Sequence, residues 1–239
     1  MSTYRADSEI SRFNRSPPGQ WFQGSPGFLQ VMSAALAVGQ QSEGAYDVTV
    51  GPLVERWGFG ADGPAETPPG AEEVAALMSR VGQGLLVVDG ERRQVMKRGE
   101  VSVDLSSIAK GYSVDVVADW LLAQGFRDFL VEVGGEIRAA GRSHRGDAWR
   151  VAIERPDPGG RGVAAALTPG DTAVATSGDY RNFFEVDGRR YSHSIDPRTG
   201  YPVVHDLVSV TVVHPSAMLA DAWAPALIVL GAEAADRVA

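Results

Sequence analysis

Lys110 follows Ser107 by three residues at the start of a predicted helix, within the segment 104–112. Backbone N–H groups at a helix start have no partner inside the helix and attract anions. The helix dipole disfavours a cation in the first turn, so an anion nearby would explain a lysine at this position. The segment therefore predicts anion binding. A serine-capped amphipathic helix with a solvated lysine accounts for the same residues.

Asp221 stands in an apolar segment, 220–227, that predicts the beginning of another helix. Carboxylate and carbonyl oxygens are the ligands that magnesium prefers, and substrate phosphates often complete its shell. Asp221 is therefore a candidate metal ligand. An aspartate that caps the helix is the alternative interpretation.

His193 precedes two turn-forming pairs, Asp196 with Pro197 and Thr199 with Gly200, within the segment 191–202. These pairs predict a tight corner that displays the histidine. A histidine there can exchange a proton near neutral pH, or it can be a hydrogen-bonded structural residue. The other three histidines show no spacing typical of paired zinc ligands.

Tyr46 lies in a segment rich in small residues, 44–52, which leads to Trp57 and residues 58–60. Small residues beside these rings could let a flat ligand approach the backbone. A buried turn with core aromatics is the alternative.

Four helices and several hairpins must position these residues. Ser25 and Pro26 predict a helix start, and apolar spacing continues the helix to residues 39–44; the other predicted helices are 74–81, 108–125 and about 220–230. Residues 232–239 also have helical character, and residues 58–70 form the best candidate for a long loop. The predicted strands are 85–89, 93–97, 101–105, 129–133, 136–140, 149–154, 182–186, 189–192 and 207–213. Consecutive hairpins with few intervening helices indicate an α+β fold with mixed or antiparallel sheets.

Composition excludes several classes of function. The 239 residues carry a net charge of −8, which argues against nucleic-acid or anionic-membrane binding. No cysteine is present, so disulfides, thiolate catalysis and cysteine zinc sites are excluded. No run approaches the roughly 20 apolar residues of a membrane span, and no secretory signal opens the sequence.

Together these segments resemble the ApbE family of FAD:protein FMN transferases. The resemblance extends over nearly the whole chain and is carried by residues 2–14, 44–52, 104–115, 132–136, 176–180, 193–202 and 220–231. It implies one ApbE-like domain over 1–239: an α+β fold with mixed or antiparallel sheets, a few packed helices and two intimately associated lobes with a flavin site between them.

In family proteins a flavin-binding strand and helix precede the position of Ser2, Thr3 and Tyr4, so we expect a chain truncated at its N-terminus, and the uncapped end suggests truncation at the C-terminus too. The chain as given is expected to be cytoplasmic. Many relatives are exported or lipid-anchored, and a missing N-terminal segment would make this one extracytoplasmic and membrane-anchored.

The resemblance also assigns residues to the site. The residues implied for FAD binding are Tyr4, Ala45, Tyr46, Asp47, Asp104, Lys110 and Ile195. Ser107, Asp221 and Ala224 are implied to surround Mg²⁺. The family usually has threonine at position 225, where this chain has Pro225. Proline lacks the hydroxyl and biases Ala224 away from helical geometry, so we expect a weakened metal site.

The implied reaction is Mg²⁺-dependent transfer of FMN from FAD to a threonine or serine hydroxyl of an acceptor protein, with release of AMP. Lys110 would neutralise phosphate charge and His193 would act as the base. Attack by water would instead hydrolyse FAD to FMN and AMP.

Two other functions are open at this point. Pro225 favours a non-catalytic flavin-binding or flavin-storage protein. Ser107 and Lys110 also fit the S-x-x-K motif of serine acyl hydrolases of the penicillin-recognising type, with imperfect partner motifs at 177–179 and 198–200.

Overall fold

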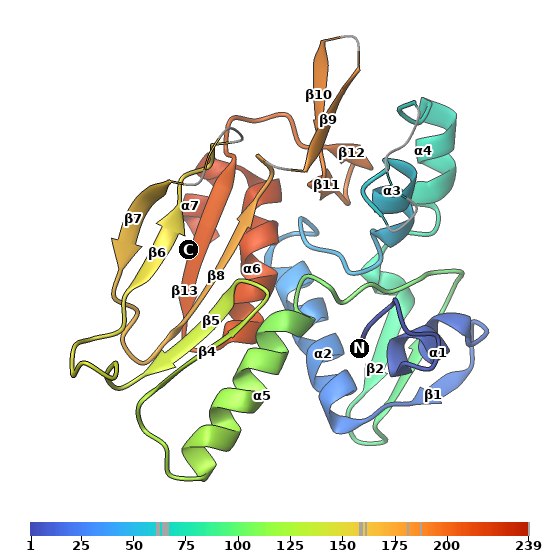
Figure 1. The fold of residues 1–239 in the computed structure, drawn as a ribbon. Helices are drawn as coiled ribbons and strands as arrows, with labels where there is room; N and C mark the ends of the chain where they lie inside the picture. Colours follow the sequence, from blue (N-terminus) through green and yellow to red (C-terminus); the bar gives the residue numbers. More distant parts are fainter. Residues whose placement is uncertain are drawn as a thin grey trace. The chain divides into compact units, whose positions relative to one another are not determined.

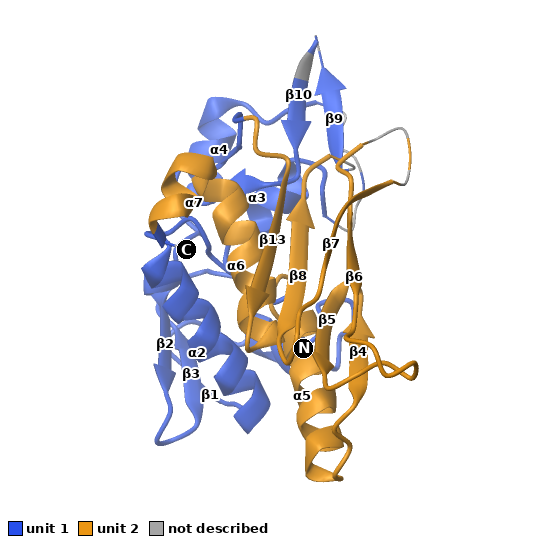
Figure 2. Cartoon of the chain, turned by 90° about the vertical axis from the view of Figure 1, so that its left-hand side faces the viewer, with its two compact units in different colours: residues 1–106, 182–205, 238 blue, residues 107–181, 206–237, 239 orange. Residues whose placement is uncertain are grey.

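The computed structural model describes residues 1–60, 63, 67–157, 160, 162–180, 182–186 and 188–238. The chain forms two compact units, coloured separately in Figure 2. One unit contains residues 1–106 and 182–205, and the other contains residues 107–181 and 206–237. All strand pairs in the described residues are antiparallel, and helices are interspersed among them, which confirms the α+β class.

The unit of residues 107–181 and 206–237 is built on a four-stranded antiparallel sheet with the order β13-β8-β5-β4. Its strands are β4 (Phe129–Val133), β5 (Glu136–Ala140), β8 (Ala173–Gly178) and β13 (Ser209–His214). The helices α5 (Ala109–Ala123) and α6 (Ala217–Leu230) pack against each other, α5 on β4 and β5, α6 on β8 and β13 (Figure 1). Both helices therefore cover one face of this sheet.

Small residues fill the space where these helices meet the sheet. Val114 packs with Ala173 and Ala217, while Ala118 packs with Phe129 and Ala140. A two-stranded sheet of β6 (Val151–Glu154) and β7 (Val163–Leu167), and residues 232–237 of the short helix α7 (Ala232–Val238), complete the unit.

The unit of residues 1–106 and 182–205 contains a three-stranded sheet with the order β1-β3-β2. Its elements up to residue 106 are α1 (Glu9–Arg15), β1 (Trp21–Gln23), α2 (Pro26–Gln41), α3 (Gly51–Arg56), α4 (Ala71–Met78), η1 (Gln83–Leu85), β2 (Leu86–Asp89) and β3 (Gln94–Lys97). Phe13, Phe22 and Phe28 pack edge to face, with centroids 5.6–6.2 Å apart, and join α1, β1 and α2.

Two further hairpins belong to this unit: β9 (Phe183–Val186) with β10 (Arg189–Ser192), and β11 (Ile195–Asp196) with β12 (Tyr201–Pro202). Ile195 joins Leu53, Trp57 and Val74 in one buried cluster. The corner that carries β11 is therefore fixed to α3 and α4.

Most predicted elements are confirmed. Ser25 caps α2 by accepting a hydrogen bond from the N–H of Phe28, and Gly125 ends α5 with φ +88°. The predicted 129–133 and 136–140 strands match β4 and β5 residue for residue. The final helix is longer than predicted, because α6 starts at Ala217 rather than near Ala220.

The predicted strand 101–105 is wrong. Val101, Val103 and Leu105 are buried as the alternation indicated, but their segment joins no sheet. The N–H of Val103 bonds to the side chain of Asn14, and the N–H of Asp104 bonds to the carbonyl of Val48. A buried extended segment can thus satisfy its backbone without a strand partner.

Residues 61, 62 and 64–66 of the predicted loop 58–70 lie outside the described residues, as does residue 187 between the predicted strands 182–186 and 189–192. Among the described residues, no helix has the length and apolar character needed to cross a membrane.

Candidate active site

The start of α5 brings Lys110 and Gly111 against α6. Ile108 is the N-cap residue, and Ser107 immediately precedes it. Gly111 lies in the first turn, where a Cβ atom would stand 2.1 Å from the carbonyl oxygen of Ala217 and 2.8 Å from Cβ of Asp221. Only glycine lets the two helices approach this closely.

Asp221 lies inside α6, so its interpretation as a helix cap is wrong. Ser216 caps the helix and accepts a hydrogen bond from the N–H of Leu219. Asp221 is buried in the second turn, where its Oδ2 accepts a 2.8 Å hydrogen bond from the N–H of Gly111. This bond brings the helix that follows Ser107 together with Asp221, as the implied magnesium site requires.

Lys110 is paired with two carboxylates. Its Nζ lies 3.0 Å from Oδ1 of Asp221 and 2.9 Å from Oε1 of Glu136, the first residue of β5. These carboxylates are the anions that explain a lysine in the first turn of α5. Glu136 and Asp221 are each about 4% exposed, whereas the Lys110 side chain is 41% exposed. Lys110 can therefore reach a ligand while it stays bound to the protein.

The charges within this cluster act on one another. Burial raises the pKa of Asp221 above its ordinary value, against the opposing effects of Lys110 and the Gly111 N–H. Burial and the neighbouring Asp221 raise the pKa of Glu136. Burial alone would lower the pKa of Lys110, but Asp221 and Glu136 raise it overall. The lysine is thus held protonated, which suits phosphate binding and opposes the role of general base for Ser107 in an acyl hydrolase.

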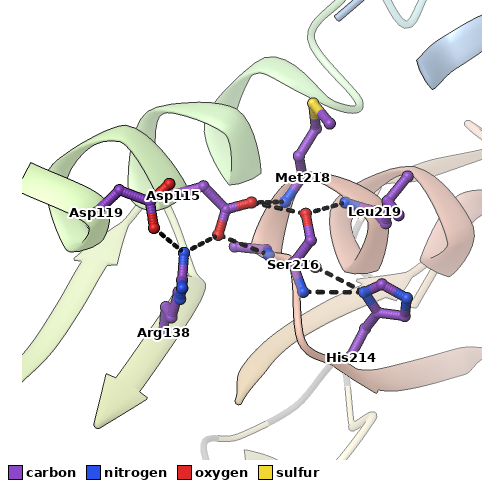
Figure 3. Close-up of polar contacts among 8 residues, drawn as sticks. Asp115, Asp119, Arg138, His214, Ser216, Met218 and Leu219 are labelled. Carbon is purple, nitrogen blue, oxygen red and sulfur yellow. Dashed lines mark hydrogen bonds and ion pairs between the residues drawn. The ribbon is translucent and has the colours of Figure 1, made fainter. Parts of the chain in front are cut away.

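A second aspartate braces the same helices one turn further along α5. Figure 3 shows Asp115 of α5 with its carboxylate at the start of α6, where the carboxylate accepts hydrogen bonds from the Ser216 hydroxyl at 2.7 Å and from the N–H groups of Ala217 and Met218 at 3.0 Å. Arg138 of β5 lies 2.9 Å from the same carboxylate. Asp115 therefore caps α6 from outside and fixes the position of Asp221.

The donors around Asp221 fit a hard divalent cation. Two buried carboxylates share one ammonium, and Oε2 of Glu136 has no hydrogen-bond partner among the described residues. In the described part of the chain no three histidine, cysteine, aspartate or glutamate side chains are grouped to hold a metal. Carboxylate oxygens such as those of Asp221, together with water and phosphate oxygens, are the ligands that magnesium prefers.

The expectation that Pro225 would draw Ala224 out of helical geometry is wrong. The helix α6 runs through both residues, and buried side chains on either side of them hold it in place. Pro225 still lacks an N–H, so the carbonyl of Asp221 receives no α-helical hydrogen bond from it.

Three of the residues implied for FAD binding, Ala45, Tyr46 and Asp47, are buried in a turn. The Asp47 carboxylate accepts hydrogen bonds from the backbone N–H groups of Thr49 and Gln83, each at 2.8 Å, and from the Thr49 hydroxyl at 2.6 Å. These bonds make Asp47 a brace for the turn that carries Tyr46.

Trp57 is a core residue, as the alternative interpretation of the aromatic segment indicated. It is 2% exposed, stacks on Tyr191 and donates from Nε1 to the carbonyl of Gly200 at 2.9 Å. Tyr4, in contrast, is 81% exposed. Asp104 is partly buried and accepts hydrogen bonds from the N–H and hydroxyl of Ser106.

The predicted corner after His193 is confirmed. The carbonyl of Asp196 accepts hydrogen bonds from the N–H groups of Thr199 and Gly200, and Gly200 has φ +80°. Ile195 and Pro202 pair across the hairpin. The His193 N–H bonds to the carbonyl of Asn182, and its ring meets Phe59 edge to face at 6.2 Å. The backbone around His193 is therefore fixed on both sides.

Glu136, Gly111 and Asp115 were not predicted as site residues. Gly111 carried a signal, because a glycine inside a helical pattern costs about 1 kcal/mol relative to alanine and indicates a packing requirement. The contacts of Glu136 and Asp115 are with residues far away in the sequence.

The α+β fold with antiparallel sheets carries a partly exposed lysine held by two buried carboxylates, and a protonated lysine of this kind suits the binding of a phosphorylated ligand. The model of a known protein family, the ApbE family, matches residues 1–239 of this chain. The FAD:protein FMN transferase of Vibrio cholerae serotype O1 is 48% identical over 239 residues, covering all of this chain and 71% of that protein. The FAD:protein FMN transferase of Escherichia coli strain K12 is 39% identical over 241 residues and is covered to 69%.

Solved structures agree. The flavin transferase ApbE from Vibrio cholerae superimposes with a TM-score of 0.90 at 47% identity, with all of this chain and 75% of that chain covered. The apo form of Pseudomonas stutzeri flavinyl transferase ApbE gives 0.86 at 41% identity, with all of this chain and 73% of that chain covered. The chain belongs to the ApbE family.

Proposed function

We propose that this chain is a Mg²⁺-dependent transferase that moves FMN from FAD to a threonine or serine hydroxyl of an acceptor protein and releases AMP. The observation that carries the proposal is Asp221, buried and held by Gly111 while it pairs with Lys110. Membership of the ApbE family and the transferase names of its relatives support the same reaction.

Each site residue has a proposed role. Tyr4, Ala45, Tyr46, Asp47, Asp104 and Ile195, with Lys110, are proposed to bind FAD. Ser107, Asp221 and Ala224 are proposed to hold magnesium. When bound, magnesium would withdraw charge from the diphosphate oxygens and so stabilise the transition state.

The chain's own groups would then serve the transfer. His193 takes the proton from the acceptor hydroxyl, whose oxygen forms a bond to the phosphorus on the FMN side of the diphosphate. The bond between that phosphorus and the bridging oxygen breaks, and AMP leaves with the electron pair. Lys110, kept protonated by its two carboxylates, neutralises charge on the phosphate oxygens. Water in place of the hydroxyl would yield FMN and AMP.

The test is to mix the protein with FAD, Mg²⁺ and candidate acceptor proteins, to follow AMP by chromatography and to weigh the acceptor by mass spectrometry. We expect AMP and an acceptor heavier by one FMN, and neither product after chelation of the metal. His193→Ala should slow transfer about 100-fold or more while FAD still binds. A wild-type rate in that variant would remove His193 as the base.

Flavin storage is the second candidate, because Pro225 supplies no hydroxyl to the metal site. The same mixture separates the two functions. FAD that is bound and recovered intact after long incubation with metal and acceptors would establish storage, whereas AMP release would exclude it.

A further inference from the structure

The charges of Lys110, Glu136 and Asp221 in the candidate site do not cancel. Nζ of Lys110 lies 2.9 Å from Oε1 of Glu136 and 3.0 Å from Oδ1 of Asp221. One ammonium thus faces two buried carboxylates, which leaves one net negative charge in a place of low solvent access. Such a cluster has room, electrostatically, for a second positive charge.

The two carboxylates differ in their other partners. Asp221 is fixed by the Gly111 N–H, which occupies its Oδ2. Glu136 is held only through Oε1, and its buried Oε2 has no hydrogen-bond partner among the described residues. Oε2 of Glu136 can therefore accept a further hydrogen bond from the Lys110 ammonium.

The turn before Glu136 leaves space for the lysine. Gly134 has φ +64°, and a Cβ atom on it would stand 3.0 Å from Cδ of Lys110 and 3.5 Å from Oε2 of Glu136. Any side chain at this position would press on the stem of the lysine. With glycine, the ammonium can turn from Asp221 toward Glu136 without losing its counter-ion.

We propose that Glu136 is a positioning residue that sets the divalent-cation affinity of Asp221, because it keeps Lys110 paired when a cation takes the Asp221 carboxylate. The inference rests on the metal site of the proposed function. Without the Glu136 charge, Lys110 depends on Asp221 alone and competes with the incoming cation. Like charges a few ångströms apart in a partly buried site repel strongly enough to change affinity on the order of tenfold or more.

The experiment is a titration of the full chain with Mn²⁺ alone, without flavin, in which free Mn²⁺ is read from its electron paramagnetic resonance signal. Four proteins are compared: wild type, Glu136→Gln, Lys110→Gln and the double variant. We expect Glu136→Gln to weaken Mn²⁺ binding about tenfold and Lys110→Gln to strengthen it. In the Lys110→Gln background, Glu136→Gln should have a much smaller effect, because Glu136 acts through the lysine.

Glu132→Gln is the matched control, since it removes the same charge from an exposed position on β4. The proposal is overturned if Glu136→Gln binds Mn²⁺ like the wild type, if it has the same effect with and without Lys110, or if none of the proteins binds Mn²⁺ at millimolar concentration. Should Glu136→Gln fail to fold, weaker binding by Lys110→Gln would overturn it alone. Since no flavin is present, these outcomes are separate from a failure to transfer FMN.

Discussion

The N–H of Gly111 on α5 donates a 2.8 Å hydrogen bond to the Asp221 carboxylate on α6, and this bond joins two residues that are 110 positions apart in the sequence. It requires the helices to touch backbone to backbone at Ala217. The proposed chemistry therefore depends on packing, because the charged cluster forms only where α5 lacks a side chain.

Gly111→Ala should destabilise the protein by about 1–3 kcal/mol, the usual cost of forcing a methyl group into a closed space. The added atom would meet backbone atoms that cannot rotate away. Urea unfolding measures the effect. Gly90→Ala is the control, since a Cβ there meets nothing within 4 Å and Gly90 has no positive φ. Equal stability of the two variants would mean that the helices separate easily.

Asp115→Ala should cost about 2 kcal/mol, because it leaves a hydroxyl and two N–H groups at the start of α6 without their acceptor. Asp119→Ala is a close comparison, since Asp119 pairs with the same Arg138 but its side chain is 67% exposed. It should change stability by less than about 0.5 kcal/mol. Thermal unfolding of both variants tests whether the cap or the ion pair matters.

Glu136→Gln should become more stable relative to the wild type as pH rises from about 4 toward neutrality. The folded-state pKa of Glu136 lies above its ordinary value of 4.5 because the carboxylate is buried. The folded protein therefore holds this proton more tightly than the unfolded chain, and stability falls as pH rises through the folded pKa. Glutamine imitates the protonated acid and avoids this loss. Denaturant unfolding between pH 4 and 7.5 measures the difference in free energy of unfolding between Glu136→Gln and the wild type. A difference that stays constant or reverses with pH would contradict the account.

Pro225→Thr should raise metal-dependent AMP release and also stabilise α6, because it restores an N–H to the Asp221 carbonyl and adds a hydroxyl. Pro225→Ala separates the two effects. It restores the N–H without the hydroxyl, so it should gain stability but not turnover. Turnover that rises equally in both variants would show that the hydroxyl has no part in the metal site.

Local sequence signals predicted much of the fold. Ser25 with Pro26 and Gly125 marked helix ends that the structure contains, and paired alternating runs identified β4 with β5. The segment 101–105 shows the limit of such signals. Its alternation indicates which residues are buried, but it does not indicate which group accepts a hydrogen bond from each backbone N–H.

The candidate site was predicted in part. Lys110 was identified by the unfavourable helix dipole at its position, and its anions are indeed present. Glu136 could not be identified as one of these anions, because its pairing with Lys110 depends on how β5 packs beside α5. The sequence placed the helix start near Asp221 because aspartate and serine are both good N-cap residues. The structure shows that Ser216 is the N-cap, and its side chain accepts a hydrogen bond from the N–H of Leu219.

The most direct test of the account compares AMP release from FAD by the wild type and by Asp221→Asn, with Mg²⁺ and an acceptor protein present. Asparagine keeps the shape and an acceptor for the Gly111 N–H but removes the charge. We predict that AMP release falls by about 100-fold or more while the variant stays folded, and that Asp119→Asn, an exposed charge-matched control, keeps the wild-type rate. Release of AMP by Asp221→Asn at the wild-type rate would contradict the account.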